Sequence, residues 1–209
     1  GSGIDTSVFS SINNLINLGR TKGLNTLDGI DILTGIENVN GGAGNDHITG
    51  NSSGNTLNGG AGNDILNGGL GNDRLVGGSG KDTAVFSSRN NRINLGITKG
   101  QNTRDGIDIL TGIENVNGGA GNDNITGNSS GNTLNGGAGN DTLNGGLGND
   151  RLIGGSGKDT AVFSSRNNRI NLGITKGQNT LDGIDILTGI ENVNGGAGHD
   201  HITGNSSGN

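Results

Sequence analysis

An aliphatic side chain recurs at every ninth position between residues 41 and 85, and a polar, glycine-rich segment precedes each one. The five units read GGAGNDHIT, GNSSGNTLN, GGAGNDILN, GGLGNDRLV and GGSGKDTAV, a pattern of G-G-x-G-x-D-x-U-x with U aliphatic. The end of a unit, such as Thr142-Leu143-Asn144, favours a short strand with one inward side chain. The glycine-rich beginning favours a turn, because glycine accepts positive φ and close backbone approach. Two consecutive nonapeptides therefore predict one coil of strand, turn, strand and turn.

Stacked coils would bury these aliphatic residues between two parallel sheets. Strands about 4.8 Å apart exchange backbone hydrogen bonds with the coils on either side, so the buried backbone is satisfied. The predicted fold is therefore all-β, a parallel β-roll or β-solenoid. Its inward series includes Ile48, Leu57, Leu66, Leu75, Ile125, Leu134, Leu143 and Leu152.

A longer repeat contains the short one, because residues 118–194 repeat residues 41–117 with four changes. We divide the chain into spacer 1–40, nonapeptides 41–85, spacer 86–117, nonapeptides 118–162, spacer 163–194 and a new block 195–209, all in one continuous solenoid. This pattern favours a piece of a longer array. Within a spacer, residues 86–99 form a longer unit, which we treat as an enlarged version of the half-coil that one nonapeptide makes. Equivalent residues of successive copies then lie on the same face of the roll. If that unit forms a full extra coil, the faces beyond it change.

The composition indicates that the hydrophobic core is thin. The 209 residues include 47 Gly and three Phe, and Pro, Cys, Met, Trp and Tyr are absent. The lack of cysteine excludes disulfides and thiolate metal sites. A net charge of −6 makes nucleic acid an improbable partner and a divalent cation a natural one. No apolar run reaches the roughly 18 residues needed for a membrane span, and no signal sequence opens the chain.

The nonapeptide resembles the RTX, or hemolysin-type calcium-binding, repeat, which is a repeat of β-helix architecture. The resemblance covers roughly three fifths of the chain directly, and the spacers are similar to segments found between such repeats in large secreted bacterial proteins. It implies calcium binding and type I secretion to the cell surface or the extracellular medium.

Stacking explains physically why such turns need a cation. Turn aspartates about 5 Å apart repel by roughly 1 to 3 kcal/mol per pair. Calcium takes six to eight oxygen ligands, and glycine-rich turns expose carbonyl oxygens that can join the carboxylates of adjacent coils. Binding then contributes directly to folding. The predicted metal ligands are Asp46, Asp64, Asp73, Asp82, Asp123, Asp141, Asp150, Asp159 and Asp200.

Alternate units lie on opposite flanks of the predicted roll. One flank would carry Asp46, Asp64, Asp82, Asp105, Asp123, Asp141, Asp159, Asp182 and Asp200. The other would carry Asn55, Asp73, Glu114, Asn132, Asp150, Glu191 and Asn209, and is depleted of charge. For Asp105, Asp182, Glu114 and Glu191, which stand in degenerate units, a structural turn or a solvated charge explains the residue as well as ligation does.

The sequence does not support catalysis. His47, His199 and His201 correspond to asparagines in other copies, which favours a surface role, and no Ser-His-Asp set recurs. The absence of Trp and Tyr also weakens a carbohydrate-binding role. We therefore expect a calcium-binding structural segment of a secreted bacterial surface protein, such as a surface layer, sheath, filament or adhesin stalk. The alternative is an accessory region of a secreted protease, lipase or polysaccharide-modifying enzyme, and flanking sequence would decide between the two.

One set of differences between copies bears on partners. Five apolar residues of the first copy have polar equivalents in the second, which predicts that they are exposed and form a patch of a few hundred Å². Such a patch fits self-association into filaments or layers, and neutral drift explains it almost as well. The pairs are Ile4 and Lys81, Ile12 and Arg89, Leu15 and Arg92, Leu24 and Gln101, and Leu27 and Arg104.

Overall fold

The computed structural model describes residues 3–9, 12–19, 24–25, 30–31, 33–164 and 166–206. The chain divides into two compact units, residues 1–86 with 97–115 and residues 87–96 with 116–209. All regular structure in the described residues is strand, and all but three of the strand pairings for which a register is given are parallel. The predicted all-β class with parallel stacking is confirmed.

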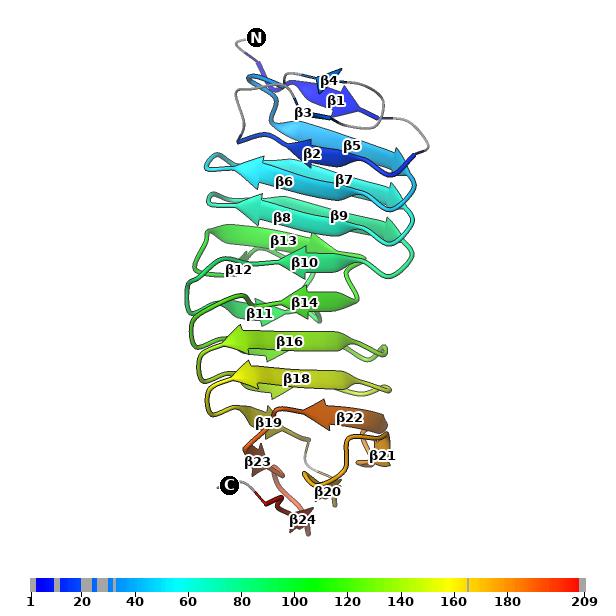
Figure 1. Ribbon diagram of the computed structural model, residues 1–209, viewed down its shortest axis with the longest axis vertical. Helices are drawn as coiled ribbons and strands as arrows, with labels where there is room; N and C mark the ends of the chain where they lie inside the picture. The colour runs from blue at the N-terminus through cyan, green and yellow to red at the C-terminus, as the bar shows by residue number, and fades with distance from the viewer. Residues whose placement is uncertain are drawn as a thin grey trace. The chain divides into compact units, whose positions relative to one another are not determined.

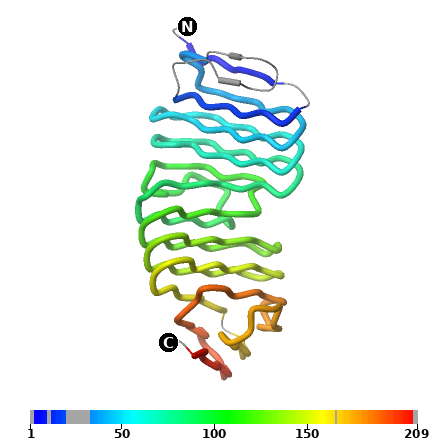
Figure 2. The backbone as a smooth tube through the Cα atoms, in the orientation of Figure 1, coloured from blue at the N-terminus to red at the C-terminus, as the bar shows by residue number. Residues whose placement is uncertain are grey.

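In the first unit, successive strands alternate between two sheets, as the backbone trace shows (Figures 1 and 2). One sheet has the order β1 (Thr6–Val8), β5 (Asn38–Ala43), β7 (Thr56–Ala61), β9 (Arg74–Ser79), β13 (Ile107–Thr111) and β12 (Gln101–Asn102). The other contains β2 (Leu15–Asn17), β6 (His47–Asn51), β8 (Ile65–Gly69) and β10 (Thr83–Val85). A separate hairpin joins β3 (Leu24–Asn25) and β4 (Ile30–Asp31).

In the second unit, one sheet has the order β16 (Thr133–Ala138), β18 (Arg151–Ser156), β22 (Ile184–Thr188) and β21 (Gln178–Asn179). A second has the order β11 (Arg92–Asn94), β15 (Asn124–Thr126), β17 (Thr142–Asn144), β19 (Thr160–Val162) and β23 (Asn192–Asn194). A third pairs β20 (Arg169–Asn171) with β24 (His201–Thr203). The division between units falls in β14 (Asn115–Asn117), after its first residue.

The aliphatic positions of the nonapeptides form the core. Val39, Leu57 and Leu75 are register partners in the adjacent strands β5, β7 and β9, and each is at most 2% exposed. All eight members of the predicted inward series are buried. Each such side chain contributes roughly 1.5 to 3 kcal/mol by leaving water. With so few large side chains, this core alone gives limited stability.

The spacer changes which of the two sheets a repeated strand belongs to. Strand β1 lies in the sheet of β5, β7 and β9, whereas β10, its equivalent in the next copy, lies in the opposite sheet beside β8. A shift of one copy therefore exchanges the sheets, and the prediction that successive copies keep the same faces is wrong.

The second unit shows the physical reason for this exchange. The longer unit of its spacer contains β20, which begins a new stack continued by β24 and does not close a half-coil on β18. The chain then reverses through the antiparallel hairpin of β21 and β22, and it is β22 that stacks on β18. The spacer thus adds one strand outside the expected alternation.

Candidate calcium sites

Glycines shape the turn that precedes each buried aspartate. In the turn before Asp64, Gly60 and Gly62 have φ values of 108° and 134°, which side-chain-bearing residues rarely adopt. This geometry reverses the chain within one short turn. It also carries the carboxylate of Asp64 into the interior, where the residue is 1% exposed.

The aspartates of consecutive coils are linked by hydrogen bonds along the stack. The backbone N–H of Asp46 donates to Oδ1 of Asp64 at 2.7 Å, and that of Asp64 donates to Oδ1 of Asp82 at 2.8 Å. The second unit repeats this series from Asp123 through Asp141 to Asp159 at 2.7 and 2.8 Å. One oxygen of each carboxylate is therefore fixed by the preceding coil in a charge-assisted hydrogen bond. We call such a series an aspartate ladder.

The second carboxylate oxygen has no such partner at most rungs. Among the described residues, Oδ2 is buried and accepts no hydrogen bond in Asp46, Asp64, Asp73, Asp82, Asp141, Asp150 and Asp159. A buried polar atom left unsatisfied costs about 1 to 3 kcal/mol, and more when it is charged. The repetition of this costly arrangement from coil to coil indicates that a cation completes it.

The space beside each free oxygen is bounded by carbonyl oxygen and kept open by glycine. A Cβ atom placed on Gly41 would overlap Oδ2 of Asp46 and would lie 2.7 Å from the carbonyl oxygen of Gly59 on the next coil. A Cβ on Gly59 or on Gly136 would likewise overlap Oδ2 of Asp64 or of Asp141. No cluster of three or more His, Asp or Glu side chains suited to a metal occurs among the described residues. Carboxylate and carbonyl oxygens without donors fit calcium.

Burial raises the pKa of these carboxyls, because it disfavours the charged form. The pKa of Asp73 and of Asp150 rises to about 6; burial is the main cause, the backbone hydrogen bond opposes it, and neighbouring carboxylates add to it. Burial also raises the pKa of Asp46, Asp64, Asp82, Asp108, Asp141, Asp159 and Asp185. Ionised ladders therefore oppose folding unless a cation neutralises them.

The model of the RTX calcium-binding nonapeptide repeat matches residues 31–60, 49–84, 108–131, 126–161 and 185–207, which is more than half of the chain. The chain belongs to the RTX family. It is a calcium-binding repeat region built from RTX nonapeptides. No curated protein matches the sequence. In the described residues, no helix is long and apolar enough to cross a membrane.

The remaining predicted ligands also lie in RTX turns. Asp123 is 2% exposed and accepts from the backbone N–H of Asn91 at 2.6 Å, and Asp200 accepts from that of Asn168 at 2.8 Å. The structure thus places all nine predicted aspartates at equivalent points of hydrogen-bonded turns. Their role as metal ligands stays a prediction.

The acidic residues with which the spacers continue each ladder differ from the predicted ones. The backbone N–H of Asp82 donates to Oε2 of Glu114 and that of Asp159 to Oε2 of Glu191, both at 2.9 Å, so these glutamates follow the charged ladders. The prediction that Glu114 lies on the flank of Asp73 is wrong, because Glu114 follows Asp82 along the stack. The prediction that Asp105 follows Asp82 is wrong for the same reason. The cause is the extra spacer strand.

Asp108 and Asp185 are the rungs that sequence reasoning missed. The backbone N–H of Asp73 donates to Oδ1 of Asp108 at 2.8 Å, and Oδ2 of Asp108 accepts the hydroxyl of Thr103. Asp185 repeats this contact with Thr180 at 2.5 Å. Because a hydroxyl already satisfies the second oxygen, these rungs are complete without a cation.

Asp182 lies outside the ladder altogether. Its carboxylate accepts the backbone N–H of Ser164 at 3.0 Å and the Ser164 hydroxyl at 2.5 Å, and it pairs with Arg166 at 3.4 Å. It is therefore a structural residue of the spacer, which was one of the two alternatives that the sequence left open.

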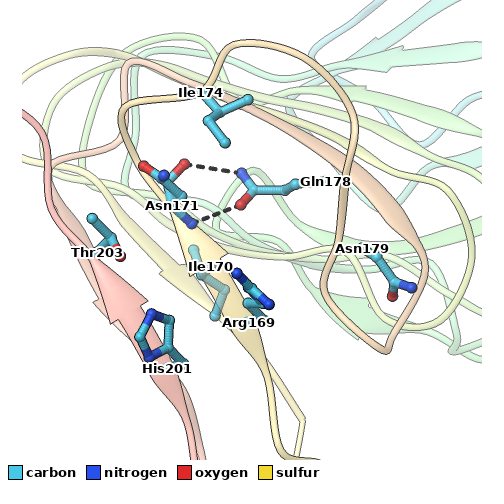
Figure 3. A pocket seen from close by; sticks show the side chains of 8 residues that line it. All are labelled: Arg169, Ile170, Asn171, Ile174, Gln178, Asn179, His201 and Thr203. Carbon is cyan, nitrogen blue, oxygen red and sulfur yellow. Dashed lines mark hydrogen bonds between the residues drawn. The ribbon is translucent and has the colours of Figure 1, made fainter.

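The second unit also has an open cavity of about 340 Å³ beside β20 (Figure 3). In it, Oε1 of Gln178 accepts from the backbone N–H of Asn171 at 2.7 Å, and Nε2 donates to the Asn171 carbonyl at 3.2 Å. The glutamine amide thus takes the place of a neighbouring strand and covers the edge of β20. His201 lines this cavity, and like His47 and His199 it is exposed.

A ladder made of consecutive aspartates and a ladder that contains asparagine predict unequal effects of mutation. Asp141 has aspartate neighbours on both sides, whereas Asp150 lies between Asn132 and the threonine-bonded Asp185. We expect Asp141→Asn to raise the calcium midpoint at least about threefold more than Asp150→Asn, because it weakens two cation sites. Calcium titrations followed by circular dichroism measure this, and equal shifts would contradict the assigned ladders.

The open space in the RTX turn predicts that replacing its glycine by alanine weakens calcium binding. Gly59→Ala would place its Cβ against Oδ2 of Asp64, so we expect about tenfold weaker calcium binding at that turn, equivalent to about 1.4 kcal/mol. Gly3→Ala is the matched control, since a Cβ there meets nothing within 4 Å. Isothermal titration calorimetry compares the two, and equal affinities would show that the cation lies elsewhere.

Proposed function

We propose that the chain is a calcium-loaded structural segment of a secreted bacterial surface protein, such as a surface layer, sheath, filament or adhesin stalk, and that it is not itself an enzyme. The observation that supports this role is the recurrence of the same contacts in both units. Asn55 donates to Asp73 at 2.8 Å in the first unit, and Asn132 donates to Asp150 at 2.8 Å in the second. The same structural module is thus repeated along the chain with its ladder intact.

Calcium links this module to the extracellular medium. Modular extracellular sites bind calcium with dissociation constants of about 10⁻⁴ to 10⁻³ M, so they fill outside the cell and stay empty inside it. The RTX family is typically secreted, and we extend that property to this chain. Folding only after export keeps the segment unfolded while it is secreted.

Antibodies against the segment test the structural role in the cells that produce it. We expect labelling on intact cells and release of the labelled protein by EGTA. The alternative role, an accessory region of a secreted hydrolase, predicts labelled protein in the culture medium that copurifies with hydrolase activity. That result would overturn the proposal.

Two exposed aliphatic side chains on the first unit, one on either side of a histidine, support lateral association. Leu15, His47 and Ile65 are neighbours in the register of β2, β6 and β8, and Leu15 and Ile65 are 47% and 38% exposed. The equivalent row of the second unit is Arg92, Asn124 and Thr142. Ile4 and Ile12 are exposed as predicted, while the side chains of Leu24 and Leu27 lie outside the described part of the structure.

Replacing Ile12 and Leu15 by arginine, the residues of the second copy, tests this surface. We expect less assembly of the calcium-loaded protein in light scattering, because charged side chains resist burial in a contact. The β signal should not change. Unchanged assembly would leave the spacer without a role as an interface.

A further inference from the structure

Three buried asparagines stand where a ladder would otherwise begin with an aspartate. Asn14, Asn91 and Asn168 are 3%, 1% and 1% exposed and occupy the same place in successive copies. Each donates its backbone N–H to Oδ1 of the next rung, which is Asp46, Asp123 or Asp200. They occupy the aspartate position of the turn, yet sequence reasoning gave them no role.

The amide nitrogens of these asparagines face carbonyl oxygens. Nδ2 of Asn91 donates to the carbonyls of Ser87, Arg89 and Gly118 at 3.4, 3.0 and 3.0 Å. Nδ2 of Asn168 makes the same three contacts, with Ser164, Arg166 and Gly195, at 3.1, 3.0 and 2.9 Å. In Asn14 the nitrogen donates to the carbonyls of Ile12 and Gly41 at 2.7 and 3.2 Å, and also to Oδ1 of Asp46 at 3.0 Å.

One of these carbonyls corresponds to the oxygen beside a free carboxylate in the RTX turns. Gly118 opens the nonapeptide that contains Asp123, the rung that follows Asn91. Gly59 opens the nonapeptide that contains Asp64, the rung that follows Asp46, and its carbonyl borders the space at Oδ2 of Asp46. The asparagine nitrogen therefore lies in the position that remains without a donor in the aspartate turns.

The amide oxygen of these asparagines also indicates that the amide nitrogen occupies the place of a cation. Oδ1 of Asn14, Asn91 and Asn168 is buried and accepts no hydrogen bond in the described structure. The donors alone thus orient each amide. A cation among the same carbonyls would reverse this orientation, because it would attract the amide oxygen and repel the N–H groups.

We propose that the side-chain amides of Asn14, Asn91 and Asn168 replace a calcium ion, so that the turn around each of them closes without metal. This inference rests on the calcium-binding function of the other turns. The partial positive charge of two N–H groups supplies, within the chain, what the cation supplies elsewhere. Each spacer then provides a turn that needs no metal of its own to join the next coil.

Native mass spectrometry of the calcium-saturated full chain tests this substitution. Asn91→Asp removes the donors and adds a carboxylate beside the same carbonyls, so we expect one more calcium ion per chain than in the wild type. Asn90→Asp is the matched control, because it adds the same charge at an exposed neighbour whose Oδ1 accepts from Asn122 at 2.8 Å, and its count should equal that of the wild type. Asn168→Asp repeats the test independently if Asn91→Asp fails to fold.

The outcomes separate this inference from the function on which it rests. A wild-type chain that binds no calcium would overturn the proposed function. A wild-type chain that loads calcium, beside folded Asn91→Asp and Asn168→Asp with unchanged counts, would overturn only the inference. Hydrogen exchange of the wild type during partial calcium depletion adds a variant-free measurement. The amides of Asn91 and Asn124 should keep protection longer than those of Asp64 and Asp141, and simultaneous loss at all four would contradict the metal-free turn.

Discussion

Chelation by EGTA is expected to abolish most of the β-structure of this chain, and excess calcium is expected to restore it. The core contains few large side chains, and most ladder aspartates have a buried carboxylate oxygen that accepts no hydrogen bond in the described structure. Without a cation, the repulsion and desolvation of the ladders act against this thin core. Because the cation sites require stacked coils, calcium binding and folding occur together.

Far-UV circular dichroism during a calcium titration measures this transition, with a midpoint of about 10⁻⁴ to 10⁻³ M. Magnesium at the same concentration is the control. It demands near-octahedral geometry and retains its water, so it should restore little structure. Identical β spectra with EGTA and with calcium would refute calcium-dependent folding. The lack of Trp and Tyr makes ultraviolet fluorescence a poor substitute for dichroism here.

In the absence of calcium, acidification is expected to recover part of the β-structure. The pKa of Asp73 and Asp150 rises from 3.8 to about 6 in the folded chain, and other ladder carboxyls shift in the same direction. The folded state therefore binds more protons than the unfolded state between about pH 4 and 6, so stability increases as the pH falls. The contribution is fully present below pH 3.8 and is lost as the pH rises through about 6.

Calcium should reverse this dependence, because protons compete with the cation for the same carboxylates. Far-UV circular dichroism of the protein dialysed free of calcium, and thermal unfolding of the calcium-saturated protein, test both directions at pH 7.5, 6.0 and 4.5. As the solution is acidified, we expect the β signal of the calcium-free protein to grow and the unfolding midpoint of the calcium-loaded protein to fall. A calcium-free β signal that does not grow with acidification would show that the buried carboxyls do not control folding.

The repeating coils could be predicted because each nonapeptide determines its own structure. Leu57 and Leu75 are buried as the period predicts, and Asp64 and Asp82 stack as the turn pattern predicts. These features depend on residues close in sequence and on one repeated stacking step. Both the core and the ladders of the nonapeptide blocks could therefore be predicted from the sequence.

The spacer could not be predicted in the same way, because it contains two competing aspartates. Asp105 fits the nonapeptide spacing, but Asp108 becomes the rung because its second oxygen reaches the hydroxyl of Thr103. That choice depends on how the hairpin of β12 and β13 folds back, which the spacing of residues does not determine. The role of the buried asparagines was missed for a related reason, since an exposed turn asparagine such as Asn90 looks the same in sequence.

The exchange of sheets with each copy has a consequence for how such an array meets its surroundings. Thr6 and its equivalent Thr83 lie in opposite sheets of the first unit, so the same side chain lies on opposite sides in these two copies. A partner that recognises a motif repeated once per copy would therefore be recruited on both sides of this unit. Such two-sided display would let one array bridge neighbours on either side, as a cross-linked layer requires.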